Sequence, residues 1–281
     1  MLGDKEMKRD KESLIITIYL IVEALCKNLL EVPPQKQKLT DAEVITIAIC
    51  SALFFNSNHD KALSWLHAAG YFPEILSLSR FNRRIHRLKS FISLCFESIR
   101  EIFLTGELYI QDSMPIPVCK YARSRRNKKA RGREHRGYCA AKKEYFFGFR
   151  LHLITNAGGL PVSLEILPAS YHDLTPIYEL TAPLKNNSIV IGDKAFNSKE
   201  DEKSLLNLGT FLMPKRKKNM KNQWTLFEER FIINEHCHQI ETTFSILHDV
   251  MSLGQIKSTT LAGFFLKIEV AVLALLFYLS F

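Results

Sequence analysis

The segment "LYIQDSM", Leu108–Met114, places an aspartate within a stretch that otherwise has the character of a β-strand. Tyr109 and Ile110 are of residue types enriched in strands, whereas aspartate is depleted there. An acid at a position that local propensity disfavours is a candidate functional residue. We therefore predict a strand at this point and regard Asp112 as a candidate site residue. An ordinary acid on an edge strand is the other interpretation.

The segments downstream of this strand alternate between strand and helix patterns. Two of them, separated by the glycine-rich "NAGG", are expected to form a hairpin. A third, "NSIVIGDKAF", is very apolar and ends at Gly192 and Asp193. Helical patterns lie between the strands, one of them capped by Ser198, and continue from Gln223 onward. Strands are expected at residues 144–155, 160–168, 187–193 and 210–214.

The segments upstream, residues 13–103, are expected to be helical throughout. Thr40 or Asp41 can cap one helix, and Ser79 can cap a later, arginine-rich helix. The order of elements predicts an α/β fold, with a mixed sheet flanked by helices and preceded by an all-helical domain. We place the boundary between residues 1–104, a helical domain with possible DNA binding, and residues 105–281, which would carry the catalytic site.

Three acids fall where such a fold could bring them together. Asp112 and Asp193 lie in or directly after predicted strands, and ligands of open α/β sheets gather at the carboxyl ends of strands. Glu241 lies on a predicted helix, one position away from the apolar stripe that includes Ile240 and Leu247. Converging carboxylates suit Mg²⁺ or Mn²⁺. Two such ions can activate and stabilise the oxygens of a phosphodiester displacement. Asp193 as a helix cap and Glu241 as a solvent-facing acid are the ordinary alternatives.

The positive charge of the chain is concentrated in one segment. The net charge is +9, and residues 120–143 contain eleven Lys or Arg and one acid. A smaller cluster lies at residues 215–221. Such density favours a polyanion, and nucleic acid in particular, because binding releases its counterions. An anionic membrane is disfavoured because the segment has no apolar face.

The remaining composition predicts a cytoplasmic location, in association with the nucleoid if DNA is the partner. The six cysteines form no CxxC pair, and the first residues do not resemble a secretory signal. Lys267 and Glu269 interrupt the apolar C-terminal segment and leave a stretch too short to cross a bilayer. We therefore expect a core helix there and no membrane partner.

A set of motifs resembles the bacterial insertion-sequence transposases of the DDE type. The motifs are "IQDSMPIPVC", "GFRLHL", "PASYHDLTP", "VIGDKAFNS" and "IETTFSIL", preceded by "LTDAEVITIAI", and they run from about Leu39 to Ala274. They are most similar to the group numbered nine-eighty-two. The resemblance implies an RNase H-like catalytic core. It also implies that Asp112, Asp193 and Glu241 hold the metal ions.

The resemblance further implies an enzyme that cuts the ends of its own element and joins them to target DNA. Its cofactor would be Mg²⁺, with Mn²⁺ as a substitute. Its partners would be the terminal inverted repeats and target DNA, and it would act as a homodimer. His248 stands where the group commonly has a basic residue, and Cys237 stands at another such position. Candidate DNA contacts are Arg125, Arg126, Lys128, Lys129, Arg131, Lys142, Lys143, Arg150, Lys215, Lys217 and His248.

Three other functions remain open on the sequence. One is a metal-dependent nuclease without strand transfer, and another is a DNA-binding protein that has lost catalysis. The third is a zinc site formed by His236, His238, Cys119 and Cys139, whose spacing fits no common zinc module. His236 and His238 would also point in different directions on a helix.

Overall fold

The computed structural model describes residues 2–29, 37–104, 106–140 and 142–280. The chain forms two compact units. One contains Met1–Ile99 together with Asp249–Phe281, and the other contains Arg100–His248. The first boundary lies close to the predicted one at residue 104. The sequence pattern assigns the C-terminal segment to the second domain, whereas Asp249–Phe281 belongs to the same compact unit as the N-terminal helices.

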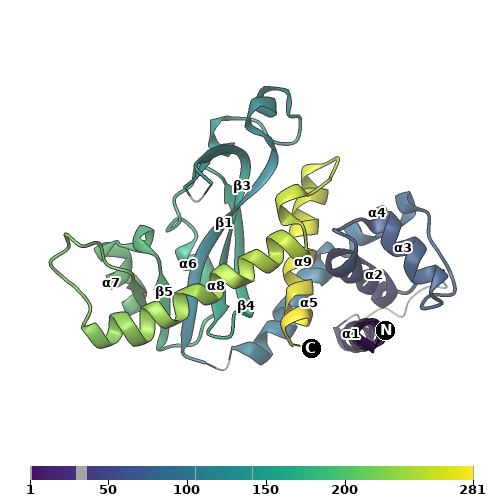
Figure 1. Cartoon of the computed structure of the whole chain (residues 1–281), viewed down its shortest axis with the longest axis horizontal. Coiled ribbons are helices and arrows are strands. Elements are labelled where there is room, and N and C mark those ends of the chain that lie inside the picture. Colours follow the sequence, from purple (N-terminus) through teal and green to yellow (C-terminus); the bar gives the residue numbers. More distant parts are fainter. Residues whose placement is uncertain (1, 30–36, 105, 141, 281) are drawn as a thin grey trace. The chain divides into compact units, whose positions relative to one another are not determined.

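The second unit is built on a six-stranded mixed sheet (Figure 1). The central strand β1 pairs antiparallel with β3 on one side and parallel with β5 on the other. Strand β6 continues the parallel side, while β2 and β4 share the outer edge of β3. This arrangement is that of an RNase H-like core, as the resemblance stated above implies. The strands are β1 (Leu108–Lys120), β2 (Arg136–Cys139), β3 (Glu144–Asn156), β4 (Pro161–Pro168), β5 (Ser188–Gly192) and β6 (Thr210–Pro214).

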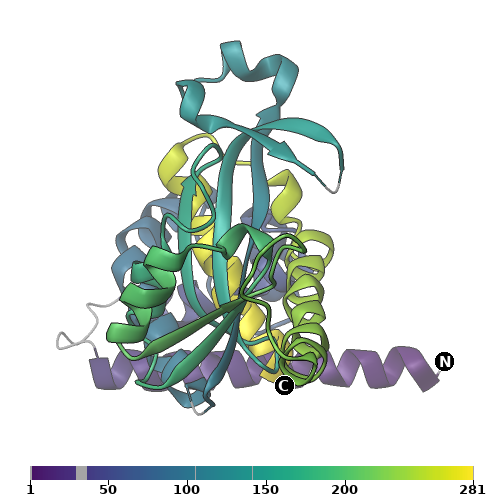
Figure 2. The ribbon, with the colours of Figure 1, turned by 90° about the vertical axis from the view of Figure 1, so that its left-hand side faces the viewer.

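Strand β1 continues well beyond the short segment that its sequence predicts. It pairs with β3 from Tyr109 to Lys120, with a bulge between Pro117 and Cys119. Pairing with β5 covers only Leu108–Ile110. Prolines are tolerated where a strand needs few of its backbone donors, such as edges and bulges. The basic residues 120–143 follow the far end of β1 and include β2. They project beyond the rest of the sheet, and we call them the basic extension (Figure 2).

Gly148 is required where β3 passes the bulge of β1. A Cβ atom at this position would lie 2.3 Å from the Ile116 carbonyl oxygen and 2.8 Å from the Val118 nitrogen. We expect Gly148→Ala to lower the free energy of unfolding by about 1–3 kcal/mol, because backbone must move to admit the methyl group. Thermal unfolding measures this change. Gly158→Ala is the control, since its nearest contact would be an Asn156 side-chain atom at 3.4 Å. Equal stability of the two variants would contradict the prediction.

Each face of the sheet is covered by different helices. Tyr109, Ile154 and Val190 face Leu180 of α6 (Ile177–Thr181) and Leu205 of α7 (Lys199–Asn207). The other face presents Ile191 and Met213 to Ile233, which lies in the π-helical segment Glu228–Asn234. Helix α8 (Glu235–Ser245) continues from that segment and packs against β1. Figure 2 shows the two sets of helices on opposite sides of the strands. The face of α8 is therefore the face on which Leu108 and Ile110 lie.

The first unit is helical, as predicted. Thr40 caps α2 through a reciprocal capping box with Glu43. The predicted cap at Ser79 is wrong, because Ser77 precedes the helix, and the single helix expected there is two helices that meet at Leu88. No Gly or Pro marks this break, which explains why the sequence pattern misses it. The helices are α1 (Leu2–Leu29), α2 (Asp41–Phe54), α3 (His59–Ala68), α4 (Leu78–Arg87), α5 (Lys89–Arg100) and α9 (Leu261–Ser280).

Helix α9 is the one helix among the described residues that is long and apolar enough to cross a membrane. Most of it is buried inside the first unit, where it packs against α2. Its two charged residues have partners in the same unit: the Lys267 ammonium donates to the carbonyl oxygens of Ser57 and Lys257, and Glu269 pairs with Lys89 at 3.1 Å. This packing is that of a core helix, as the sequence predicts.

Candidate active site

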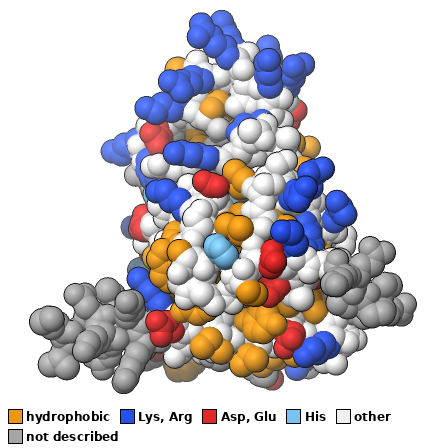
Figure 3. Space-filling model, turned by 90° about the vertical axis from the view of Figure 1, so that its right-hand side faces the viewer, with side chains coloured by type: hydrophobic (Ala, Val, Ile, Leu, Met, Phe, Trp, Pro, Cys, Tyr) orange, Lys and Arg blue, Asp and Glu red, His pale blue; other side chains and the backbone are white. Residues whose placement is uncertain are grey.

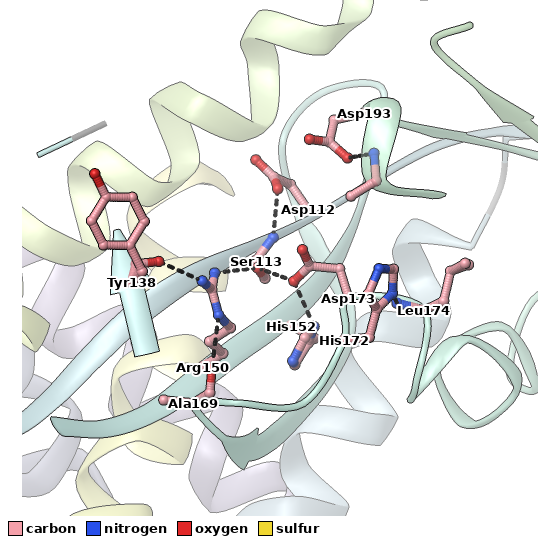
Figure 4. A network of polar contacts seen from close by, with 11 residues as sticks. Asp112, Ser113, Tyr138, Arg150, His152, Ala169, His172, Asp173, Leu174 and Asp193 are labelled. Atoms are coloured by element: carbon pink, nitrogen blue, oxygen red, sulfur yellow. Dashed lines mark hydrogen bonds and ion pairs between the residues drawn. The ribbon is translucent and has the colours of Figure 1, made fainter. Parts of the chain in front are cut away.

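Asp112 and Asp193 lie side by side just beyond the stretch over which β1 and β5 pair in parallel. The last residue pair between β1 and β5 is Ile110 with Ile191, and each aspartate follows two residues later. Because side chains alternate along a strand, both aspartates point to the face of α8. Figure 4 shows the two carboxylates next to each other. The sequence prediction that these two acids meet is therefore consistent with the sheet register.

The electrostatic environment of this pair disfavours negative charge. The pKa of Asp112 is raised to about 7, mainly by burial and also by the nearby Asp193, Asp173 and Glu241, while the Ser113 backbone N–H acts in the opposite direction. That N–H donates to Asp112 Oδ1 at 2.7 Å. The pKa of the more exposed Asp193 is also raised, first by its partial loss of water and then by Asp173, against a backbone hydrogen bond from Ala195. Clustered carboxylates of this kind favour a cation between them.

Asp173 is the acid that the sequence interpretation missed. It lies in the loop between β4 and α6, within the "PASYHD" motif, which was the only signal for it. The Ser113 hydroxyl donates to Asp173 Oδ1 at 2.6 Å, and the buried His152 lies 3.9 Å from the same oxygen. Ser113 thus contacts two carboxylates, Asp112 through its backbone and Asp173 through its side chain (Figure 4).

Arg150 completes this network and is used differently from the DNA contact that we predicted. Its guanidinium donates to the Ser113 hydroxyl at 3.2 Å, to the Tyr138 carbonyl oxygen at 2.9 Å and to the Ala169 carbonyl oxygen at 3.4 Å. It therefore holds β1, β2 and the Asp173 loop together. A direct role of Arg150 in DNA binding remains a prediction.

Glu241 lies on the expected helix but does not close the site. Helix α8 is anchored to the β3–β4 turn, where the Thr243 hydroxyl donates to the Gly159 carbonyl oxygen at 2.9 Å. The Glu241 side chain is 69% exposed and pairs with His238 at 3.3 Å. Of the three acids that raise the pKa of Asp112, it contributes least. Within the described ranges, no three His, Cys, Asp or Glu side chains lie close enough to hold one metal ion. This statement covers His236, His238, Cys119 and Cys139, the ligands of the alternative zinc site.

The model of the transposase DDE domain matches residues 104–260, more than half of the chain. The chain belongs to the DDE transposases. Among solved structures it is similar to the piggyBac transposase synaptic complex with hairpin DNA, at 11% identity and a TM-score of 0.48, over 95% of this chain and 72% of that one. It is also similar to the Mos1 strand transfer complex, at 13% identity and a TM-score of 0.26, over 81% and 82% of the two chains. No curated protein matches the chain.

The acids of this DDE transposase have the donor chemistry that a hard divalent cation requires. Asp112, Asp173 and Asp193 supply only carboxylate oxygens; Asp173 and Asp193 raise the pKa of Asp112, and Asp173 raises that of Asp193. Oxygen donors of this kind suit Mg²⁺ or Mn²⁺ and are poor ligands for softer metals. The residues present therefore fit the cofactor that a DDE domain implies.

Most of the predicted DNA contacts of the transposase lie on the basic extension, residues 120–143. Arg125, Arg126, Lys128 and Arg131 are exposed and line a hollow of about 500 Å³. Figure 3 shows Lys and Arg side chains gathered over the upper end of the molecule, where this extension lies. The backbone N–H of Lys129, another predicted contact, donates to the Asn127 side-chain oxygen. Lys143, also a predicted contact, lies in a turn with a positive φ of 51°.

Two further groups of predicted contacts lie apart from this hollow. Lys142 Nζ is 3.4 Å from His248 Nε2, so the structure brings these two predicted contacts together. The Lys215 backbone N–H donates to the Gly192 carbonyl oxygen at 2.9 Å, which places this lysine beside Asp193. Lys217 is exposed further along the same segment.

Proposed function

We propose that the chain is the transposase of an insertion sequence of the nine-eighty-two group. It would cut DNA at the ends of its own element and join those ends to target DNA. The observation that carries the proposal is the pair of adjacent aspartates just beyond the parallel pairing of β1 with β5, within a matched DDE domain. The positively charged extension supports DNA as the substrate.

In this proposal Asp112, Asp193 and Glu241 bind the Mg²⁺ ions. The bound ions would supply activation of the attacking oxygen and stabilisation of the departing one. The Ser113 backbone N–H fixes the orientation of the Asp112 carboxylate. For this role Glu241 would exchange its exposed contact with His238 for the metal ions. No covalent protein intermediate is required, so no nucleophilic side chain is needed.

The substrate DNA would lie along the extension and reach the aspartates past Lys142, His248 and Lys215. Cutting two ends of one element in a concerted reaction requires two active sites, so we propose a homodimer in the complex with DNA. Its partners are then the terminal inverted repeats and the target.

Cleavage of a plasmid that carries the gene with its native flanks tests the proposal. With Mg²⁺ or Mn²⁺ we expect breaks at the element boundaries, and we expect none after chelation with EDTA. A plasmid with scrambled flanks is the control. Cutting that is scattered along both plasmids would favour a nuclease without strand transfer. Tight DNA binding without any metal-dependent cutting would contradict the proposal and favour a DNA-binding protein that has lost catalysis.

A further inference from the structure

Three tyrosines form a row across the outer end of the sheet. Tyr138 of β2 and Tyr145 of β3 are paired directly across the strands. Lys120 is the last residue of β1 to pair with β3, opposite Phe146, so Tyr121 follows at the level of Tyr145. The ring centroids of Tyr121 and Tyr145 are 5.7 Å apart, and those of Tyr138 and Tyr145 are 5.1 Å apart.

The rings of this row, Tyr121–Tyr145–Tyr138, are exposed to an unusual degree. Tyr145, in the centre, is 65% exposed, while Tyr121 and Tyr138 are 39% and 45% exposed. Aromatic rings gathered at a surface typically mark an interaction site, because their burial by a partner is favourable. The sheet itself does not require them there, since the core of this unit lies elsewhere.

The charges around the row favour a polyanionic partner. Lys120 and Arg123 flank Tyr121, and Lys142 and Lys143 precede Tyr145 in the chain. The exposed arginines of the extension follow directly after Tyr121. A second protein surface would have to be strongly acidic to match this surround, whereas nucleic acid supplies phosphates and flat bases together.

The row also lies on the functional face of the sheet. Alternation along β3 puts Tyr145 on the same face as Leu153, and Leu153 is the partner of Asp112 in the sheet register. The eight residue steps from Tyr145 to Leu153 span about 26 Å of strand. A DNA strand advances about 3.4 Å per nucleotide. A strand that ends at Asp112 would thus meet the tyrosines about eight nucleotides away.

We propose that the row Tyr121–Tyr145–Tyr138 is a base-stacking site for an unpaired strand of the DNA. It rests on the proposed function only in taking DNA as the bound polymer. Stacking of a base on an aromatic ring needs unpaired or unstacked nucleotides, since the faces of paired bases are covered by their neighbours. The basic flanks hold the phosphates of the same strand. The row therefore distinguishes opened or frayed DNA from intact duplex.

Fluorescence anisotropy with two oligonucleotides tests this inference. One is an intact duplex that is long enough to cover the basic extension. The other carries a single-stranded overhang labelled with 2-aminopurine. We expect Tyr145→Ala to weaken binding of the overhang substrate by about 5- to 100-fold, from about 1–3 kcal/mol for each stacked base. Binding of the duplex should change less than about twofold. Quenching of the 2-aminopurine should be lost in the same variant.

The controls separate stacking from other roles of the ring. Tyr145→Phe keeps the ring and should bind like wild type, so equal loss in the Phe and Ala variants would overturn the inference. Tyr178→Ala, at a tyrosine that is 38% exposed on α6, is the matched control and should bind like wild type. Tyr121→Ala lies outside the strands and serves if Tyr145→Ala does not fold. It should show the same selective loss.

Other outcomes are equally decisive. Equal weakening of duplex and overhang binding by Tyr145→Ala would overturn the inference. Loss of a dimer in light scattering, with overhang binding unchanged, would assign the row to a second copy of the chain and also overturn it. A wild type that binds DNA but shows no preference for the overhang would overturn the inference alone. A wild type that binds neither oligonucleotide would overturn the proposed function as well.

Discussion

Asp112→Asn is expected to lower the rate of cleavage at the element ends by about a thousandfold or more, while making the metal-free protein more stable at pH 8. The loss of activity follows from the loss of one carboxylate that would hold the metal ions, since several kcal/mol of charge stabilisation correspond to this factor. The same expectation for activity applies to Asp193→Asn. DNA binding should remain, because the exposed basic extension is unchanged.

The gain in stability follows from the pKa of Asp112. In the folded protein this pKa is about 7, above the ordinary value of 3.8. A folded-state pKa above the unfolded value means that folding favours the protonated form. The contribution of Asp112 to stability is therefore fully present below about pH 4 and is lost as the pH rises through 7. The neutral asparagine removes this loss, so the variant should be more stable than wild type at pH 8 by about 2–4 kcal/mol. Near pH 4 the two proteins should be similar.

Thermal unfolding in EDTA at pH 4.5 and pH 8 measures this difference. Added Mg²⁺ should then stabilise wild type at pH 8 and should stabilise Asp112→Asn much less, because only wild type retains the full set of ligands. Asp201→Asn, at a carboxylate that accepts from the Tyr178 hydroxyl, is the control and should show neither effect. A variant that is less stable than wild type at pH 8 would contradict the destabilising effect that the raised pKa of Asp112 predicts there.

Neutralisation of the basic extension is expected to reduce DNA affinity by about 10²–10³-fold at low salt. The variant replaces Arg125, Arg126, Lys128 and Arg131 by glutamine, which are the exposed residues around the hollow. Each phosphate contact contributes about 0.9 to the slope of log affinity against log salt concentration. Loss of four contacts should thus lower the slope by about 3–4, and the difference between the proteins should shrink as salt rises.

A matched variant distinguishes this surface from net charge alone. It replaces Lys61, Lys185, Lys199 and Lys203, four exposed lysines outside the extension, by glutamine. We expect its affinity and its salt slope to remain close to those of wild type. If both variants lose affinity equally, the protein binds DNA through its overall charge and the extension has no special role.

The sequence predicts the elements of the sheet better than it predicts their lengths. The hairpin of β3 and β4 and the strand that ends at Gly192 follow from alternation and from glycine-rich turns. The far half of β1 was missed because Pro115 and Pro117 indicate a break, and only pairing with β3 keeps that segment extended. Long-range pairing of this kind leaves no local signal.

The candidate site shows the same limit. Asp112 and Asp193 could be predicted because each sits at odds with a strongly apolar strand. Asp173 could not, because it lies in a loop, where acids are common. The contacts of Arg150 depend on three segments that meet only in the folded chain. The sequence shows the positive charge of Arg150 but not the groups to which it donates.

The packing of α9 with the N-terminal helices has a consequence for how the chain folds during synthesis. Residues 100–248 form a compact unit that is inserted between two parts of the other one. This inserted unit can complete its core before α9 has been made, whereas α2 must wait for α9 to cover its apolar side. A fragment that starts near residue 105 and includes α9 would leave that helix without its partner and should aggregate, while residues 100–248 should be soluble alone.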